Sequence, residues 1–184
     1  MKSTKDLIIE AGLKVFSEKG YKSATTLEIS KTAGVSEMTL FRHFETKHNL
    51  FILTVKEALG SSLLESEKLN LGMDLKEFTM TLLHEKLLVI SQEINLIKML
   101  IRETLSHNLP KDLAFTKIIS NQIIDNIKNY VAQHDLDLDP VYFTHMIVGL
   151  LLRYAVIEEN PIYHQLTREQ QTDYLKNYLQ LLNI

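Results

Sequence analysis

Hydroxyl and cationic side chains gather between residues 25 and 47 of this sequence. Thr25 and Thr26 come first, Ser36 and Thr39 follow, and Lys47 ends the stretch. Hydroxyl and ammonium groups donate hydrogen bonds to phosphate oxygens, and helix N-termini attract the same anions through their unpaired amides. These residue types therefore suit contact with phosphate groups, with helix capping and ordinary surface polarity as the alternative.

Residues suited to catalysis or metal binding form no recognisable motif. The sequence has no cysteine, which excludes thiol nucleophiles and cysteine-containing zinc sites. His84-Glu85 begins like the metalloprotease motif His-Glu-x-x-His, but Leu88 stands where the second histidine belongs. There is no glycine-rich phosphate loop and no Gly-x-Ser-x-Gly nucleophile motif. We expect no cofactor, no metal and no enzymatic activity, with a small-molecule enzyme as a distant alternative.

The elements that must position the phosphate-binding side chains are helices. Six glycines and three prolines in 184 residues leave long uninterrupted segments, and apolar residues recur at helical spacing. The first of these segments predicts a helix over Ser3–Lys19 that ends at Gly20. We predict an all-α fold of about nine helices, in which an N-terminal helix-turn-helix head precedes a larger helical body.

Two of the predicted helices are short and joined by a tight turn, which is the helix-turn-helix pattern. They cover Thr25–Ala33 and Ser36–Phe44, and Gly34-Val35 joins them. Gly34 can take the left-handed conformation that ends a helix. The Ser36 hydroxyl can accept hydrogen bonds from the first amides of the next helix. Each residue type thus suits a sharp connection between two helices.

One face of the second short helix is predicted to point outward. At 3.6 residues per turn, Leu40 and Phe44 share the face that packs inward. The opposite face and its flanks carry Met38, Thr39, Phe41, Arg42 and His43. Arg42 is either a surface charge or a reader of bases. Glu37 is most simply an acid that stabilises the helix start, with acceptance of a hydrogen bond from cytosine as the alternative.

The region from residue 11 to residue 51 resembles the N-terminal signature of TetR-family regulators. The matching residues are Ala11, Phe16, Gly20-Tyr21, Thr25-Thr26, Ile29, Ala33-Gly34-Val35-Ser36, Thr39-Leu40-Phe41, His43-Phe44, Lys47 and Leu50-Phe51. The resemblance implies that the helix over residues 36–44 enters the major groove of double-stranded DNA. It also implies that a homodimer reads a pseudo-palindromic operator and answers to a small-molecule effector.

The resemblance further implies that Thr26, Phe41, His43 and Lys47 meet phosphates, but two positions depart from the family pattern. Met38 replaces the usual glycine, and Phe41 replaces the usual tyrosine, whose hydroxyl would bond a phosphate. Because of these departures, an alternative function remains: a helical protein-interaction module whose helix-turn-helix no longer binds DNA. The full set of predicted DNA-binding residues is Thr25, Thr26, Ser36, Glu37, Met38, Thr39, Phe41, Arg42, His43 and Lys47.

We expect residues 1–48 to form the DNA-binding domain and residues 49–184 to form a ligand-binding and dimerisation domain. Residues 1–57 carry nine lysines and arginines against seven acidic residues, and the remainder carries eleven against sixteen. A mildly basic head on an acidic body places attraction and repulsion of DNA on different surfaces. In the body, capping residues predict helix starts at Asp74, Pro110, Asp139-Pro140 and Thr167.

Two sets of body residues carry the remaining predictions. A homodimer interface is predicted on the last two helices, because one chain end would struggle to bury both of their apolar stripes. Its residues are Met146, Gly149, Leu150, Arg153, Tyr154, Ile157, Tyr174, Leu175, Tyr178, Leu179 and Leu182. A pocket for the effector is predicted where a few polar groups stand amid apolar ones, although the same residues could fill a closed core. Its residues are Phe78, Leu82, Met99, Glu103, Phe115, Gln122 and His145.

No segment of the sequence suggests secretion or membrane insertion. The longest apolar run, Met146 to Leu152, falls well short of the roughly 20 residues that cross a bilayer. The first residues lack the apolar stretch of a signal peptide. We expect a cytoplasmic protein with no membrane partner.

Overall fold

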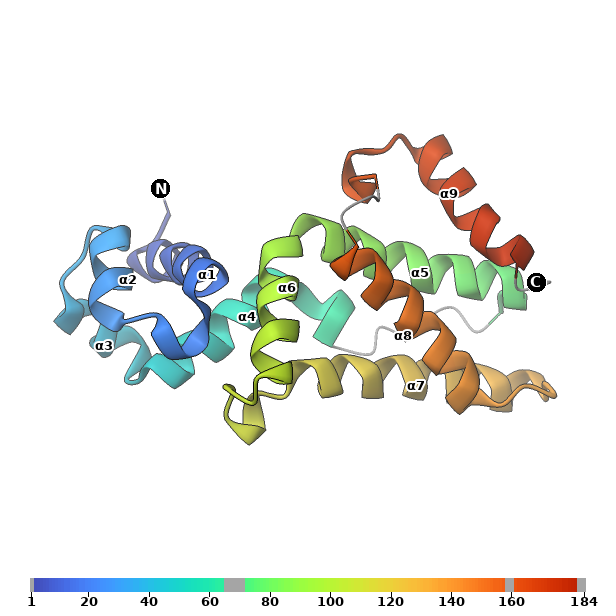
Figure 1. Cartoon of the computed structure of the whole chain (residues 1–184), viewed down its shortest axis with the longest axis horizontal. Helices are drawn as coiled ribbons and strands as arrows, with labels where there is room; N and C mark the ends of the chain where they lie inside the picture. The colour runs from blue at the N-terminus through green and yellow to red at the C-terminus, as the bar shows by residue number, and fades with distance from the viewer. Residues whose placement is uncertain (1, 65–71, 158–160, 182–184) are drawn as a thin grey trace. The chain divides into compact units, whose positions relative to one another are not determined.

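The computed structural model describes residues 2–64, 72–157 and 161–181, and these residues form helices and connecting loops without any strand (Figure 1). This confirms the predicted all-α class with nine α-helices in the described part of the chain. The elements are α1 (Thr4–Ser23), α2 (Thr26–Ala33), α3 (Glu37–Phe44), α4 (Lys47–Leu64), α5 (Leu75–Gln92), α6 (Ile94–Leu105), η1 (Lys111–Leu113), α7 (Phe115–His134), α8 (Pro140–Val156), η2 (Tyr163–Gln165) and α9 (Arg168–Leu181).

The chain divides into two compact units. The first contains Met1–Gly60 and Asn95–Thr116, and the second contains Ser61–Ile94 and Lys117–Ile184. The units do not coincide with the predicted division between residues 48 and 49, because most of α4 and α6 belongs to the unit that holds α1, α2 and α3. The assignment of DNA binding to residues 1–48 and of ligand binding and dimerisation to residues 49–184 stays a prediction.

An aromatic cluster forms the centre of the first unit. Phe16 of α1 meets Phe51 of α4 edge to face, with ring centroids 4.9 Å apart. The centre of the Tyr21 ring lies 4.8 Å from that of Phe51, and the centre of the Phe115 ring lies 6.1 Å from it. Phe16 and Phe51 are fully buried. Edge-on aromatic pairs of this kind add to the stabilisation that burial alone provides, so the cluster ties α1 to α4.

Gly20 interrupts α1 rather than ending it, which corrects the predicted helix end at Lys19. Its backbone has φ 80° and ψ 167°, a region that is essentially reserved for glycine, and the helix resumes as far as Ser23. The Glu103 carboxylate of α6 packs on the same residue so closely that a Cβ at Gly20 would lie 2.5 Å from its Oε1. The kink sets the place of residues 21–24.

Local capping confirms most of the predicted helix starts in the second unit. Asp74 caps α5 by accepting from the Glu77 amide at 2.8 Å, and Asp139 caps α8 with Pro140 at its first turn. Thr167 and Gln170 bond each other's amides at the start of α9. The predicted start at Pro110 is wrong for α7. Pro110 precedes the single turn η1, and α7 begins at Phe115.

The second unit is held together by helices α5, α8 and α9 and by the short turn η2. The rings of Phe78 and Tyr130 stack with centroids 3.9 Å apart, and the Tyr130 hydroxyl donates to the Met73 carbonyl at 2.9 Å. Tyr163 of η2 is fully buried, and its hydroxyl lies 2.8 Å from Nδ1 of His84. Burial raises the pKa of Tyr163 to about 12. Polar bonds therefore fix η2 against α5.

The contact between His84 and Tyr163 should make the stability of the second unit depend on pH. Burial, and secondarily the charge of Arg168, lowers the pKa of His84 in the folded chain. The unfolded chain, with the ordinary histidine pKa near 6.5, takes up its proton at a higher pH. The stability due to neutral His84 is thus complete above about pH 6.5 and is lost as the pH falls toward the lower folded value.

Thermal unfolding between about pH 7.5 and 5.5 tests this dependence. We expect the midpoint of His84→Gln to fall less over this range than that of the wild-type chain. The matched control is His145→Gln, because His145 is an exposed histidine of α8 in the same unit. Equal falls in all three proteins would contradict the assignment.

In the part of the chain that the structure describes, no helix is long and apolar enough to cross a membrane. The same residues contain no cluster of three or more potential metal ligands.

Candidate nucleic-acid interface

The turn between α2 and α3 is built as a sharp connection. Gly34 has φ 71° and ψ 29°, the left-handed conformation, and its amide donates to the last carbonyls of α2. The next amide, that of Val35, donates to the Ser30 carbonyl at 3.0 Å. Together these bonds satisfy carbonyls that the end of α2 leaves unpaired. The structure confirms the predicted turn.

The orientation of α3 follows from its cap and its two buried residues. The Ser36 hydroxyl accepts from the Thr39 amide at 3.1 Å, which confirms the predicted cap. Leu40 is fully buried and Phe44 is 2% exposed. Since both lie on one face of this eight-residue helix, the opposite face points to solvent.

The outward face of α3 carries the side chains predicted for it. Met38 is 82% exposed and Phe41 is 42% exposed, and Arg42 and His43 are also exposed. The capping residues Thr25 and Ser36 lie on the surface, whereas Thr39 is half-buried. The structure thus presents a compact set of side chains along one short helix.

Several polar groups of the predicted interface are engaged within the chain. The Thr26 hydroxyl donates to Oε1 of Glu37 at 2.5 Å, which joins the start of α2 to the start of α3. Thr25 accepts from the Glu28 amide at 3.2 Å, and Ser36 and Thr39 share a hydrogen bond between their hydroxyls. A hydroxyl has one proton to donate, so Thr26 would have to leave Glu37 before it could donate to a phosphate.

Lys47 begins α4 and reaches back to the end of α1. Its Nζ donates to the Ala24 carbonyl at 2.9 Å and to the Lys22 carbonyl at 3.4 Å. The same ammonium lies 4.8 Å from the centre of the Tyr21 ring, within the range of a cation–π contact. Burial lowers the pKa of Lys47. This support of α1 has no local sequence signal, because the carbonyls are more than twenty residues away.

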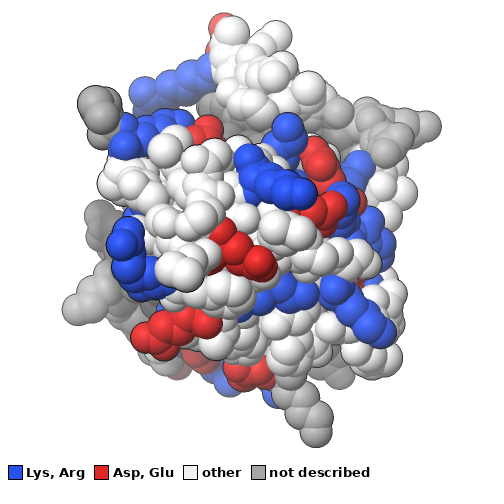
Figure 2. Space-filling view, turned by 90° about the vertical axis from the view of Figure 1, so that its left-hand side faces the viewer, with Lys and Arg blue, Asp and Glu red and all other residues white. Residues whose placement is uncertain are grey.

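The surface near α2 and α3 is mixed in charge. Figure 2 views the molecule from the side on which these helices lie, and lysines and arginines alternate there with acidic side chains. Much of the surface between the charged groups belongs to neither class. Long-range attraction of DNA is therefore modest, and binding would depend on individual contacts.

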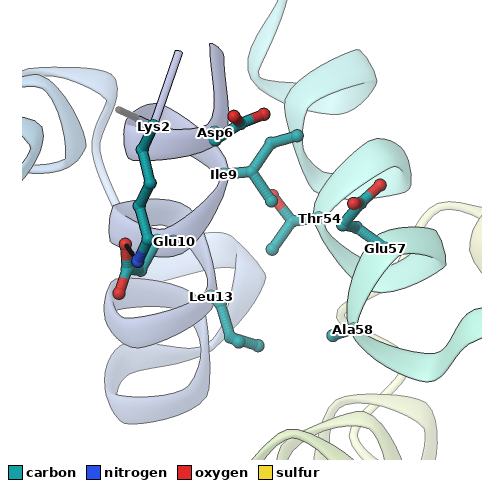
Figure 3. Close-up of a pocket in the computed structure, with 8 residues that line it drawn as sticks. All are labelled: Lys2, Asp6, Ile9, Glu10, Leu13, Thr54, Glu57 and Ala58. Atoms are coloured by element: carbon teal, nitrogen blue, oxygen red, sulfur yellow. Dashed lines mark hydrogen bonds and ion pairs between the residues drawn. The ribbon is translucent and has the colours of Figure 1, made fainter. Parts of the chain in front are cut away.

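A shallow groove lies between α1 and α4 of the first unit (Figure 3). Its lining residues are Lys2, Asp6, Ile9, Glu10, Leu13, Thr54, Glu57 and Ala58, and its volume is about 230 Å³. Lys2 pairs with Glu10 at 2.7 Å, and Asp6 accepts from the Ser3 amide as part of the α1 cap. The groove is smaller than the roughly 300–1,000 Å³ of ordinary ligand sites. It shares no residue with the predicted effector pocket.

The predicted effector pocket is divided between the two units. Met99, Glu103 and Phe115 belong to the first unit, where they are buried. The other members belong to the second unit: Phe78 and Leu82 are buried, Gln122 is half-buried, and His145 is exposed. The Gln122 Oε1 atom is buried without a hydrogen-bond partner among the described residues. The assignment of these residues to one pocket stays a prediction.

The predicted dimer residues fall into a buried and an exposed group. Tyr154, Leu175 and Leu179 are buried within the second unit, and Tyr174 and Tyr178 are half-buried with their hydroxyls 3.2 Å apart. On α8, Leu150 is half-buried and Met146, Gly149 and Arg153 are exposed, as is Ile157 directly after the helix. Leu182 lies outside the described residues. The exposed group is the part that a second chain could contact.

The fold and the arrangement of α2 and α3 define a helix-turn-helix protein with an all-helical body. Residues 8–53 match the family model described as bacterial regulatory proteins of the tetR family. The match covers a quarter of the 184 residues, so over its N-terminal part the chain is similar to regulators of the tetR family.

Three known proteins illustrate the similarity. The chain is 33% identical over 105 residues to the uncharacterized HTH-type transcriptional regulator YvkB of Bacillus subtilis, covering 56% of this chain and 53% of that protein. It is 36% identical over 52 residues to IcaR, the negative transcriptional regulator of the icaADBC biofilm operon of Staphylococcus aureus, covering 28% of each. Its fold matches AibR, solved with isovaleryl coenzyme A and operator DNA, with a TM-score of 0.66 and 15% identity over 94% of this chain and 96% of AibR. The aligned region spans about half the length of YvkB and less of IcaR.

Proposed function

We propose that this chain is a homodimeric transcriptional repressor that binds a pseudo-palindromic operator and is released from it by a small-molecule effector. The observation that carries the proposal is the outward face of α3, which the buried Leu40 and Phe44 hold away from the core. In a helix-turn-helix, this face of the second helix enters the major groove. Residues 1–48 would bind DNA, and residues 49–184 would bind the effector and the second chain.

The names of related proteins support repression, operator binding and a small-molecule effector. IcaR is named a negative transcriptional regulator, and AibR was solved with both operator DNA and a coenzyme A thioester. The relatives are described as regulators of transcription, which disfavours the enzyme alternative. The predicted pocket residues share no local motif, so they do not indicate the chemical class of the effector of this chain.

The exposed face of α8 supports dimerisation. Tyr142 is 73% exposed, Met146 36% and Val156 53%, and they lie with Gly149 and Arg153 at spacings of three and four residues. A Cβ added at Gly149 would meet nothing within 4 Å, so the space beside this residue is open. A second copy of the same face would cover these apolar side chains in a symmetric contact.

The first experiment offers the full chain a random library of DNA duplexes. We expect enrichment of duplexes with two related half-sites whose centres lie about 34–36 Å, or a multiple, apart. Light scattering at micromolar concentration should give the mass of two chains. If no duplex is enriched, the alternative of a helix-turn-helix that no longer binds DNA is favoured. If light scattering gives the mass of one chain, the proposed homodimer is wrong.

The second experiment tests the effector. A compound that raises the unfolding temperature of the chain should weaken its binding to the enriched duplex, and the duplex should weaken binding of the compound by the same factor. Coupling of the usual size would change the affinity roughly 5–150-fold. If several stabilising compounds leave the affinity for DNA unchanged, the chain is a constitutive DNA binder.

A further inference from the structure

The outward face of α3 carries two exposed side chains that are large and apolar. Met38 stands at the second position of the helix with 82% of its surface exposed, the largest value among the exposed large apolar residues of the described chain. Phe41 follows three residues later, so the two side chains are neighbours on one face. Keeping two large apolar groups in water forgoes the stabilisation of burying them, unless a partner covers them.

The polar side chains beside this pair are already engaged. Thr39 shares a hydrogen bond with Ser36, and Glu37 accepts from Thr26. The first turn of α3 therefore presents chiefly an apolar surface, with Arg42 and His43 exposed one turn further on. The two apolar side chains of this surface, Met38 and Phe41, offer no strong hydrogen-bond donor or acceptor to the edges of guanine and cytosine.

Thymine is the base that offers an apolar group in the major groove. Its C5-methyl group projects there, and apolar side chains contact it. We propose that Met38, supported by Phe41, recognises thymine methyl groups, so that the operator half-site requires thymine at the positions facing the start of α3. This inference rests on the proposed function as a DNA-binding protein, and it names the base chemistry that the same site reads.

The test uses a duplex enriched from the random library by the full chain. Each thymine of one half-site is replaced in turn by uracil, which removes the methyl group and leaves the pairing unchanged. Burial of one methyl group corresponds to about a fourfold change in affinity. We expect one or two uracil positions to weaken binding by about this factor, measured by fluorescence anisotropy. The other thymine positions should tolerate uracil.

Met38→Ala connects the effect to the side chain. The variant should bind the thymine duplex more weakly than the wild-type chain and should bind the thymine and uracil duplexes equally. Because Met38 is exposed, the variant should unfold at the wild-type temperature. The matched control is Leu27→Ala, since Leu27 is 49% exposed on α2 of the same unit and should leave the uracil penalty intact.

The outcomes separate this inference from the proposed function. Failure to enrich any duplex overturns the proposed function and the inference with it. Enrichment followed by uniform tolerance of uracil, or by a uracil penalty that Met38→Ala retains, overturns the inference alone. In a further outcome, light scattering gives Met38→Ala a different oligomeric mass from the wild-type chain while both proteins discriminate equally between the thymine and uracil duplexes. This result would show that a second protein chain, and not DNA, covers Met38.

Discussion

Gly20→Ala should unfold far more readily than the wild-type chain and should lose most of its affinity for DNA. Two costs add at this residue. The backbone at φ 80° and ψ 167° is essentially closed to alanine, and the new Cβ would lie 2.5 Å from Oε1 and 2.8 Å from Cδ of Glu103. Strain of this kind and overpacking each cost about 1–3 kcal/mol, so we expect a loss of about 3 kcal/mol or more.

We expect Gly20→Ala to lower the affinity for DNA as well as the stability, because the kink at Gly20 positions the end of α1. Residues 21–24 follow Gly20 directly, and they supply the Tyr21 ring and the two carbonyls that Lys47 contacts. Denaturant unfolding and anisotropy with an enriched duplex measure the two effects.

Two further variants test the cause. Gly34→Ala is the matched control, because Gly34 also has a positive φ, 71°, but a Cβ there would meet nothing within 4 Å. We expect it to cost only about 1–2 kcal/mol. Glu103→Ala in the Gly20→Ala background should recover the part of the loss that is due to the clash. If Gly20→Ala and Gly34→Ala cost the same, the contact with Glu103 is not tight in solution.

Lys47→Ala should weaken binding to all DNA sequences about equally and should also destabilise the head. An ammonium group has three N–H donors, and in Lys47 two of them point to the carbonyls of Lys22 and Ala24. We expect the third to donate to a phosphate of bound DNA. Removal of one phosphate contact reduces the salt dependence of binding by about one unit, and loss of charged hydrogen bonds costs about 1–2 kcal/mol at a half-buried site.

The salt titration distinguishes two roles of Lys47. If Lys47→Ala lowers stability but leaves the salt dependence of DNA affinity unchanged, the side chain serves only to hold the end of α1. Lys56→Ala is the matched control, because Lys56 is an exposed lysine of the same helix, and it should change neither quantity. Changes of the same size in both variants would mean that the effect is one of net charge.

The sequence by itself determined the helical class, the helix-turn-helix and most helix starts. The caps at Ser36, Asp74 and Thr167 act on amides within three residues, so the local sequence contains both partners. The conformation of Gly34 is likewise a property of one residue and the turn around it. A proline favours the start of a single turn as well as that of a long helix. Pro110 precedes the single turn η1, and the long helix α7 begins only at Phe115.

Only the tertiary structure decided which distant groups meet. The fold packs the Glu103 carboxylate on the kink at Gly20, more than eighty residues away, a contact that no local sequence signal indicates. The assignment of Glu103 to an effector pocket stays a prediction. The sequence predicts that Lys47 contacts a phosphate. In the fold, its ammonium group also donates hydrogen bonds to two carbonyls at the end of α1. Side-chain spacing along a helix identifies the face that turns inward, but it does not identify the residue on the neighbouring helix that this face will touch. That choice depends on how the helices pack together, which no local pattern specifies.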